Sequence, residues 1–487
     1  MGRFVISFDT ADEEVRHREA PGLLHTQGFS TDIYFPRLGI GVVEDEPERL
    51  EAFRGRCAAQ QRPMQYFPEL TYYAINAGAD RDGGDSPGAG EFTWGLEAVQ
   101  IRRAVQTGAA GAGVRVAVLD TGFDASHPDF ADRSVVVESF ITGQGPQDVH
   151  GHGTHCIGTA CGPWHTAAGA AQSPGYGVAS EAEIYSAKVL GDDGAGSDTS
   201  ILAGIDWALQ NDCQVISMSL GADVPQVHPP YVTAGRRALE QGAVMIAAAG
   251  NNAHRSAGDH GFVGAPANSP YVMAVAAVDE QLRIADFSAR SLPHEGGEID
   301  IAAPGVEIYS AWPTPQRYQS ISGTSMAAPH VSGIAAVIAG ASGLRGQELW
   351  DALISAAVPV QGAAAEDVGA GLAAVPANLV SESPTTGAGV PGTGTAEVGP
   401  AEPQHWVITV DDEHLSHIDD VVAQLQEAGL VVEKVLRSLG QITGYTEGTS
   451  VQSDEVSGTQ RLGAVNGVAS IDGAQRHSVA PPDAEVQ

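Results

Sequence analysis

Between residues 92 and 380 the sequence alternates between short apolar runs and alanine-rich stretches. The apolar runs have the length and composition of buried strands, and the stretches between them have those of helices. Parallel strands need a crossover connection, which a helix usually supplies. The alternation therefore predicts an α/β domain, in which helices cover both faces of a parallel sheet. The expected strands are 114–119, 183–189, 215–220, 244–249 and 271–278.

Two segments rich in glycine and proline, 78–90 and 381–404, flank this region and contain almost no large apolar side chains. Such a composition is typical of linkers. We therefore expect three domains joined by two linkers. The domains are 1–77, 92–380 and 405–487, and the linkers are 78–91 and 381–404.

The two outer parts show the same order of predicted elements, β-α-β-β-α-β, which is typical of small α+β domains of the ferredoxin-like kind. The first has strands at 4–8, within 31–43 and near 69–75, with a helix after the first strand and another at 47–60. The last has strands at 406–410, 431–436, 441–445 and 467–471, with helices at 415–428 and near Thr459. The sequence thus predicts two copies of one small fold beside the α/β domain.

The charge of the chain argues against a nucleic-acid partner. It has 60 acidic and 25 basic residues and a formal net charge of −35, whereas a nucleic-acid binder needs a basic surface. We expect no membrane span, because no run of about 18 uncharged apolar residues appears. The opening residues lack the apolar core of a secretory signal. The location is unknown from the sequence; we expect the cytoplasm by default, or secretion by a route that the sequence does not reveal.

Three motifs carry side chains capable of chemistry, and the first follows an apolar strand. Asp120 ends the run 116–119, so its carboxylate is expected at the carboxyl edge of the sheet, where ligand sites collect. Taken alone, such an aspartate is more often a helix cap or a turn residue.

The second motif is HGHGTHC, residues 150–156. Its glycines flank His152 and let other backbone approach the imidazole closely. Two interpretations are open: a general base at His152, or a metal site formed by His150, His152 and His155. Zinc-binding helices usually carry His-x-x-x-His with a glutamate between the histidines, which this segment lacks. The general base is therefore favoured, and His155 is expected to be structural.

The third motif is GTSMAAPH, residues 323–330, at the start of an alanine-rich helix. Ser325 could be only an N-cap there, but a helix start also offers backbone N–H groups and a positive end to an oxyanion. A serine hydroxyl needs an adjacent base, which is itself oriented by a carboxylate. Asp120, His152 and Ser325 offer these three roles.

Together these motifs resemble those of the subtilisin-like serine proteases, the subtilases, whose triad has the same order of Asp, His and Ser. The resemblance covers about 92–380 and rests on VAVLDTG, SHPDF, HGHGTHCIGT, SMSLG, AAAGN and GTSMAAPH. It implies a serine endopeptidase that hydrolyses polypeptides through an acyl-enzyme and requires no cofactor. An esterase with an α/β-hydrolase fold is excluded, because Ser325 lacks the Gly-x-Ser-x-Gly context and the triad order differs.

By this resemblance Asp120 orients the imidazole, His152 takes the proton and Ser325 attacks the peptide carbonyl. Asn251 matches the side-chain donor of the family's oxyanion hole, although an asparagine after a glycine is otherwise a common turn residue. These roles are implied by the match of each motif.

The substrate-binding residues are implied in the same way. Two segments match the edges between which the family holds an extended substrate as an added strand. The glycine-rich one could also be a plain surface turn. Small pocket walls and the uncharged Asn252 indicate a roomy apolar pocket before the scissile bond. The two edges are Gly194-Ala195-Gly196 and Ser219-Leu220-Gly221, and the walls include Ala248, Gly250 and Gly264.

The chain also departs from the family pattern. Asp129 stands where many relatives ligate calcium, but the asparagine-rich loop that supplies further ligands is not recognisable in 162–177. Calcium is therefore an optional ligand, and a turn or salt-bridge role for Asp129 stays open. Four cysteines are too few for a disulfide scaffold, so we expect free, buried thiols. Cys156 occurs in some branches of the family and is expected to pack rather than react.

The outer domains resemble the family's inhibitor propeptide. Residues 68–76 form a strand able to enter the active site, and cleavage is expected between Ala74 and Glu91. Residues 463–473 resemble the closing segment of a propeptide but follow the protease domain; a ferredoxin-like appendage for another partner is the alternative. The chain is thus interpreted as a self-processed or self-inhibited zymogen whose partners are polypeptide substrates and its own terminal domains. The alternative is a protease-derived binding or regulatory module that these domains hold shut.

Overall fold

The computed structural model describes residues 2–75, 90–165, 174–379 and 404–474. Short gaps lie at 9, 11–13, 30–32, 60–61, 63, 293–296, 412–413, 437–440, 447–461 and 463–464. Residues 1–382 form one compact unit and residues 383–487 a second. The two segments expected to be linkers lie almost entirely outside the described residues.

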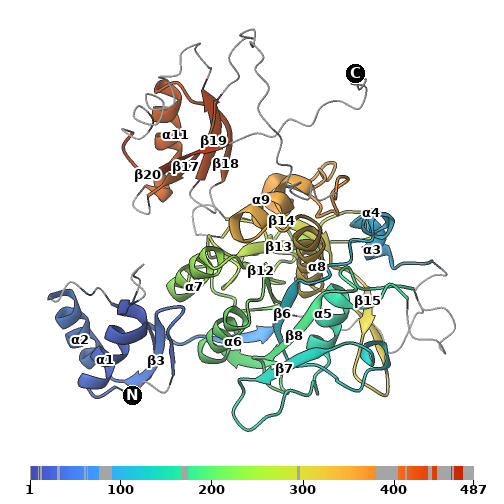
Figure 1. Ribbon diagram of the computed structural model, residues 1–487, viewed down its shortest axis with the longest axis horizontal. Coiled ribbons are helices and arrows are strands. Elements are labelled where there is room, and N and C mark those ends of the chain that lie inside the picture. Colours follow the sequence, from blue (N-terminus) through green and yellow to red (C-terminus); the bar gives the residue numbers. More distant parts are fainter. Residues whose placement is uncertain are drawn as a thin grey trace, which may run out of the picture. The chain divides into compact units, whose positions relative to one another are not determined.

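The first unit is built around seven strands: β6 (Arg115–Asp120), β7 (Val135–Ser139), β8 (Glu183–Lys188), β10 (Val215–Met218), β12 (Val244–Ala248), β13 (Met273–Val278) and β14 (Ile301–Pro304). They form one sheet in the order β14-β13-β12-β10-β6-β8-β7, and every neighbouring pair is parallel (Figure 1). This confirms the predicted α/β fold class. All five predicted strands are present, and the sheet has further strands, β7 and β14, at its two edges.

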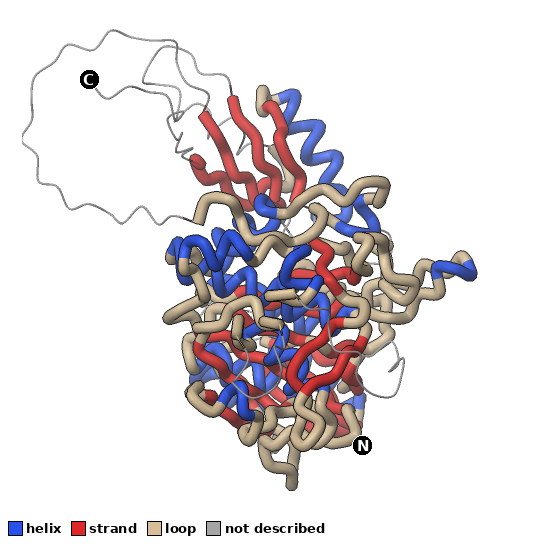
Figure 2. The backbone as a smooth tube through the Cα atoms, turned by 90° about the vertical axis from the view of Figure 1, so that its right-hand side faces the viewer, coloured by secondary structure: helices blue, strands red, loops and turns tan. Residues whose placement is uncertain are grey.

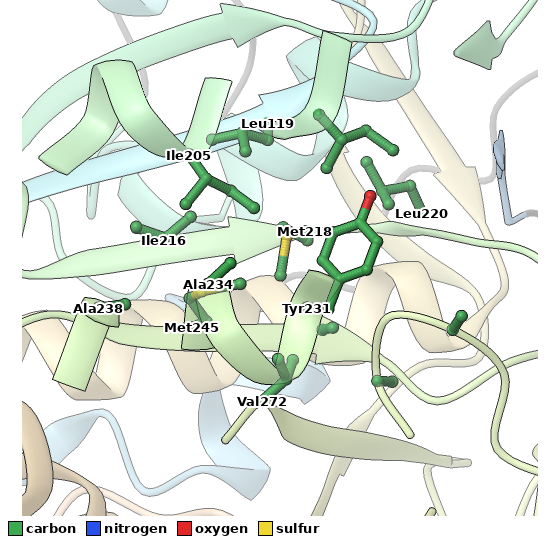
Figure 3. Close-up of a cluster of buried hydrophobic side chains, with 14 of the residues drawn as sticks. Leu119, Ile205, Ile216, Met218, Leu220, Tyr231, Ala234, Ala238, Met245 and Val272 are labelled. Atoms are coloured by element: carbon green, nitrogen blue, oxygen red, sulfur yellow. The ribbon is translucent and has the colours of Figure 1, made fainter. Parts of the chain in front are cut away.

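Helices cover both faces of this sheet (Figure 1, Figure 2). On one face α8 (Thr324–Ser342) packs beside α5 (His152–Cys161), and Ser332 of α8 donates a 2.9 Å hydrogen bond to Ser217 of β10. The neighbours of Ser217, Ile216 and Met218, join a buried cluster with α6 (Asp198–Gln210) and α7 (Pro229–Glu240) on the other face (Figure 3). Because strand side chains alternate between faces, a doubly covered sheet needs strands that are apolar throughout.

Further elements of this unit surround the sheet. They are the helices α3 (Trp94–Ala98), α4 (Arg102–Thr107), α9 (Gly346–Ala356) and α10 (Ala365–Val368), and the hairpin of β15 (Ile308–Ala311) and β16 (Tyr318–Ile321). One helix among the described residues, α8, is both long enough and apolar enough to cross a membrane. However, 89% of its apolar stretch is buried inside the protein. Such burial is typical of a core helix.

The N-terminal residues form a small antiparallel sheet of β1 (Gly2–Ser7), β2 (Tyr34–Phe35), β3 (Ile40–Asp45) and β4 (Gln65–Pro68), in the order β2-β3-β1-β4. The same part of the chain contains helices α1 (Ala20–Thr26) and α2 (Pro47–Ala59). The prediction that a strand near 69–75 closes this sheet is wrong. The sheet closes with β4, and the next strand, β5 (Thr71–Ala74), pairs elsewhere. The expected strand near 69–75 therefore contains β5 but not β4, and the two strands belong to different sheets.

The second unit has the same strand topology. Its strands β17 (Gln404–Val410), β18 (Val431–Leu436), β19 (Gln441–Thr446) and β20 (Val468–Ala474) form an antiparallel sheet in the order β18-β19-β17-β20. Helix α11 (Ile418–Glu427) contributes Val421 and Leu425 to a core that includes Ile408 and Ile442. In both small sheets the strands therefore lie in the order second, third, first, fourth. The helix expected near Thr459 lies outside the described residues.

Candidate active site

The three motif residues meet at the carboxyl edge of the parallel sheet. Asp120 is the last residue of β6, His152 the first of α5 and Ser325 the second of α8. The Sγ atom of Cys156 lies 3.8 Å from Nδ1 of His152 and 3.6 Å from the backbone oxygen of Ser325, so both helix starts converge on one point. All three motif side chains are buried.

Asp120 and His152 form a buried hydrogen-bonded pair. Nδ1 of His152 lies 2.7 Å from Oδ1 of Asp120, which also accepts a 2.7 Å bond from the backbone N–H of Thr121. A carboxylate beside Nδ1 favours the tautomer with the proton on that nitrogen, which leaves Nε2 as the basic atom. Nε2 is buried and has no hydrogen-bond partner among the described residues. The pair is therefore arranged to accept a proton at Nε2.

The Ser325 hydroxyl bonds to the backbone rather than to the imidazole. It donates to the carbonyl oxygen of Ser219 at 3.0 Å, while the Ser219 hydroxyl donates to the carbonyl oxygen of Ser325 at 2.7 Å. A rotation about the Cα–Cβ bond of Ser325 would redirect the hydroxyl. Catalytic hydrogen bonds are often long or misaligned until a substrate is reacting. The present orientation of the Ser325 hydroxyl is therefore compatible with the triad roles.

Asn251 lies three residues beyond β12 and points its amide at a backbone carbonyl. Its Oδ1 accepts bonds from the backbone N–H and the hydroxyl of Thr324, at 2.9 and 2.8 Å, which fixes the orientation of the amide. Its Nδ2 donates to the carbonyl oxygen of Ile75 at 3.1 Å. A Cβ atom at Gly323 would lie only 2.8 Å from that oxygen. This corner is thus shaped to hold a carbonyl oxygen.

Strand β5 lies in this site between two segments of the α/β domain. It pairs antiparallel with β9 (Ala195–Ser197) on one side and β11 (Leu220–Gly221) on the other. The backbone N–H of Ala74 also donates to the carbonyl oxygen of Gly194 at 2.9 Å. The two segments identified in the sequence as substrate edges therefore do hold an extended strand, and it belongs to the chain's own N-terminal part.

Ile75, the residue after β5, lies beside Gly221 and Gly323. A Cβ atom at Gly221 would lie 2.7 Å from Cδ1 of Ile75, so the Ile75 side chain packs closely against this glycine. Ala248 is buried at the end of β12, and Gly264 approaches the backbone of Ala222. Gly250 donates its backbone N–H to the Thr324 hydroxyl at 3.2 Å. The amide of Asn252 is used internally, since it donates to Asp223 at 3.1 Å and to the carbonyl oxygen of Phe262 at 3.0 Å.

The motif analysis missed Asp148, which organises the loop before His152. Its carboxylate accepts hydrogen bonds from the Thr121 hydroxyl (2.9 Å), the Gly151 N–H (2.8 Å), and both the N–H (2.8 Å) and the hydroxyl (2.7 Å) of Thr154. These bonds join the loop after β6 to the first turn of α5, and thus hold Asp120 and His152 in register. The sequence signal that could have revealed Asp148 is its position as a carboxylate two residues before the HGH sequence.

Within the described residues, His150, His152 and His155 do not cluster as metal ligands. Nε2 of His155 is 2.8 Å from the carbonyl oxygen of Ile308, and burial lowers the pKa of His155 to about 3, so it is neutral and structural. In the part of the chain that the structure describes, the one group of clustered metal-ligand types is Asp120, His152 and Cys156. The four cysteines are free and buried, as predicted, and burial raises the pKa of Cys156 well above its usual value.

Two tyrosines occupy one oxygen of Asp129, the expected calcium ligand. Its Oδ2 accepts hydrogen bonds from the hydroxyls of Tyr176 and Tyr318, at 2.8 and 2.9 Å. Calcium requires six to eight oxygen ligands, whereas these two groups point protons at the carboxylate. Residues 166–173, within the loop that would supply further ligands, lie outside the described residues. Asp129 therefore stabilises the packing of two tyrosines.

The chain is similar in sequence to known proteins over the α/β domain. The model of the Subtilase family matches residues 111–374. Subtilisin DY of Bacillus licheniformis is 39% identical over 246 residues, which cover 50% of this chain and 83% of that protein. The thermostable alkaline protease of Halalkalibacterium halodurans is 42% identical over 50% of this chain and 62% of its own length. The cuticle-degrading protease of Metarhizium anisopliae is 37% identical over 51% of this chain and 61% of its own length.

Proposed function

Because the chain belongs to the subtilase family and is a subtilisin-like serine endopeptidase, we propose that Asp120, His152 and Ser325 are its catalytic triad and that its N-terminal domain keeps it as a zymogen. The proposed domains are the N-terminal one (1–77), the catalytic one (92–380) and the C-terminal one (405–487). The proposal rests on the geometry at the carboxyl edge of the sheet.

In this mechanism Ser325 Oγ attacks the substrate carbonyl carbon while His152 Nε2 takes the hydroxyl proton. Asp120 holds the imidazole through Nδ1 and stabilises its positive charge. Asn251 Nδ2 donates to the oxygen that becomes negative, and the start of α8 provides a further backbone N–H. The imidazolium then gives its proton to the leaving amine, and an acyl-enzyme remains. Water attacks this ester by the same route, which restores Ser325.

One observation supports the zymogen proposal. β5 pairs with both substrate edges, and the carbonyl oxygen of Ile75 accepts a hydrogen bond from Asn251 Nδ2. A strand held in this way has Ile75 before the bond that Ser325 would attack. The N-terminal domain is thus both an inhibitor of the cleft and its first substrate. The side chain at that position is apolar, so we propose large apolar residues as the preferred ones before the scissile bond, because the pocket walls are small and uncharged.

Self-processing is expected at the bond between Ile75 and Asn76. A purified preparation incubated at neutral pH should yield a fragment whose N-terminus is Asn76, as measured by intact mass and N-terminal sequencing. Ile75→Asp should slow this cleavage strongly, because a carboxylate would enter an apolar pocket without a partner. Val105→Asp, a comparable change from a β-branched apolar residue to aspartate at an exposed position of α4, should be processed as the wild type is.

Two results would contradict this proposal. An active preparation whose N-terminus lies elsewhere would show that Ile75 is not the processed position. A preparation that stays intact and turns over no peptide would favour the alternative, a regulatory module that its own terminal domain holds shut.

We propose that the C-terminal domain acts in cis on the catalytic domain, because it repeats the strand order of the N-terminal sheet. As a statistical coil, a linker of the length of 381–404 would reach about 25–30 Å. Such a tether raises the local concentration to about the millimolar range, at which weak contacts suffice for binding.

Ending the chain at Val380 tests this role. If the domain inhibits, the truncated protein should hydrolyse a small peptide faster; if it assists folding, the soluble yield should fall and recover when the fragment is added. Activity assays and yield of soluble protein measure the two outcomes. Unchanged yield and unchanged kinetics, with no binding of the isolated fragment, would contradict a role in cis.

A further inference from the structure

Four polar side chains meet beneath β5, three residues before Ile75. Tyr72 comes from β5, Asp198 is the first residue of α6, His228 precedes α7 and Tyr231 belongs to its first turn. Tyr72, Asp198 and Tyr231 are each 0% exposed and His228 is 7% exposed. The Tyr72 and Tyr231 rings meet edge to face, with centroids 5.6 Å apart. A substrate side chain in place of Tyr72 would therefore enter a closed pocket with a carboxylate in its lining.

The hydrogen bonds of Asp198 are only partly satisfied. Its Oδ2 accepts from the backbone N–H of Leu70 at 2.7 Å and lies 3.1 Å from Nε2 of His228. Its Oδ1 is buried and has no hydrogen-bond partner within the described part of the chain, and the hydroxyls of Tyr72 and Tyr231 also have none there. A buried acceptor without a donor is costly. Two phenol donors and one free carboxylate oxygen are thus confined in one pocket.

Burial, together with the nearby Asp198, raises the pKa of both phenols. The pKa of Tyr72 is raised well above its usual value by burial and by the nearby Asp198 charge. The pKa of Tyr231 is raised by burial, by Tyr72 and by Asp198. Figure 3 shows the Tyr231 ring projecting from α7 within the buried cluster, with its hydroxyl at the far end. Both groups therefore remain donors that a carboxylate can accept.

Resting on the proposed function, we propose that Asp198 is a specificity residue that selects tyrosine as the fourth residue before the scissile bond. A small rotation of the phenol brings its O–H onto Oδ1, and the Tyr231 ring supplies the edge-to-face contact. Phenylalanine fills the same space but leaves Oδ1 without a donor. The neighbouring Tyr73 is 57% exposed, so the third position should not distinguish tyrosine from phenylalanine.

The test uses the full chain after self-processing and chromogenic hexapeptides with the sequence of residues 70–75. The wild-type peptide has tyrosine at both central positions, and each tyrosine is replaced by phenylalanine in turn. We expect kcat/KM to fall about 10–100-fold when the fourth residue before the scissile bond is changed, the loss expected for a hydrogen bond to a charged acceptor. The change at the third residue should alter it less than about twofold.

Variants at Asp198 assign the preference to its carboxylate. Asp198→Leu should remove the preference for tyrosine, and Asp198→Asn, which keeps a neutral acceptor, should retain part of it. The tripeptide Tyr-Ala-Ile, which does not reach the pocket, should be hydrolysed equally by the wild type and both variants. If the leucine variant does not fold, the peptide series with the wild type and the asparagine variant still shows whether Asp198 sets the preference for tyrosine.

Equal turnover of the two peptides that differ at the fourth residue would overturn the inference. So would faster turnover of a peptide with lysine there, because the carboxylate would then select a cation. Either result leaves the endopeptidase proposal intact. An absence of turnover for every peptide, the tripeptide included, would refute the proposed function and the inference with it.

Discussion

Replacing Ser325 with alanine is expected to lower kcat on a peptide substrate by about 10⁶-fold, the magnitude known for removal of the nucleophile in subtilisin, a member of the same family. The variant should also leave the bond after Ile75 intact. The fold should persist, because alanine favours a helix and the lost hydroxyl donates one hydrogen bond, to the Ser219 carbonyl oxygen. Steady-state kinetics measure the loss, and circular dichroism verifies the fold.

Ser342→Ala is the matched control for this change. Ser342 ends the same helix, is exposed and bonds only locally, since its hydroxyl donates to the carbonyl oxygen of Ile338 and accepts from the backbone N–H of Leu344. It should leave kcat unchanged. If Ser325→Ala kept more than about a thousandth of the wild-type kcat, another residue would have to supply the nucleophile, and the assignment of the triad would be wrong.

Replacing Asn251 with leucine is expected to lower kcat by about 10²–10³-fold with little change in KM. This is the magnitude known for loss of the side-chain donor in the oxyanion hole of subtilisin. The physical reason is that Nδ2 stabilises an oxygen that becomes charged only in the transition state, so its loss affects turnover more than binding. Separate determination of kcat and KM measures the effect.

Two further variants separate the lost donor from other effects. Asn251→Asp keeps the acceptor for the Thr324 N–H but removes the donor, and it should lose turnover as well. Asn211→Leu makes the same substitution at the end of α6, where the amide bonds to the carbonyl oxygen of Trp207, and should retain wild-type kcat. A wild-type kcat for Asn251→Leu would show that its amide does not act on the reacting oxygen.

The central strands of the parallel sheet could be predicted from the sequence, but its edges could not. The inner strands are covered on both faces, so they are continuous apolar runs that stand out in the sequence. β7 alternates between half-buried and exposed residues, because an edge strand has a single neighbour and meets solvent. β14, at the other edge, is only four residues long and ends in Pro304. Neither gives the long apolar signal by which the other strands were found.

The candidate site shows a similar division. Its proposed catalytic residues lie in short motifs and could be named from the sequence, and the structure brings Asp120 and His152 into contact. Asp198 could not be named, because its partners are distant along the chain, and Asp148 could not be named, because its bond to Thr121 of the loop after β6 forms only in the folded chain. Asp198 receives its hydrogen bonds from Leu70 and His228, and no spacing in the sequence reveals such contacts. The same limit applies to β5, whose partners are 120–150 residues away.

The most direct test of the assigned chemistry is to label the self-processed chain with a fluorophosphonate and map the adduct by peptide mass spectrometry. The activated serine displaces fluoride, and its Oγ forms a bond to phosphorus. The account predicts one adduct, on Ser325, that is absent from Ser325→Ala and is formed only slowly by Asn251→Leu. An adduct on a different residue, or equal labelling of Ser325→Ala, would contradict it.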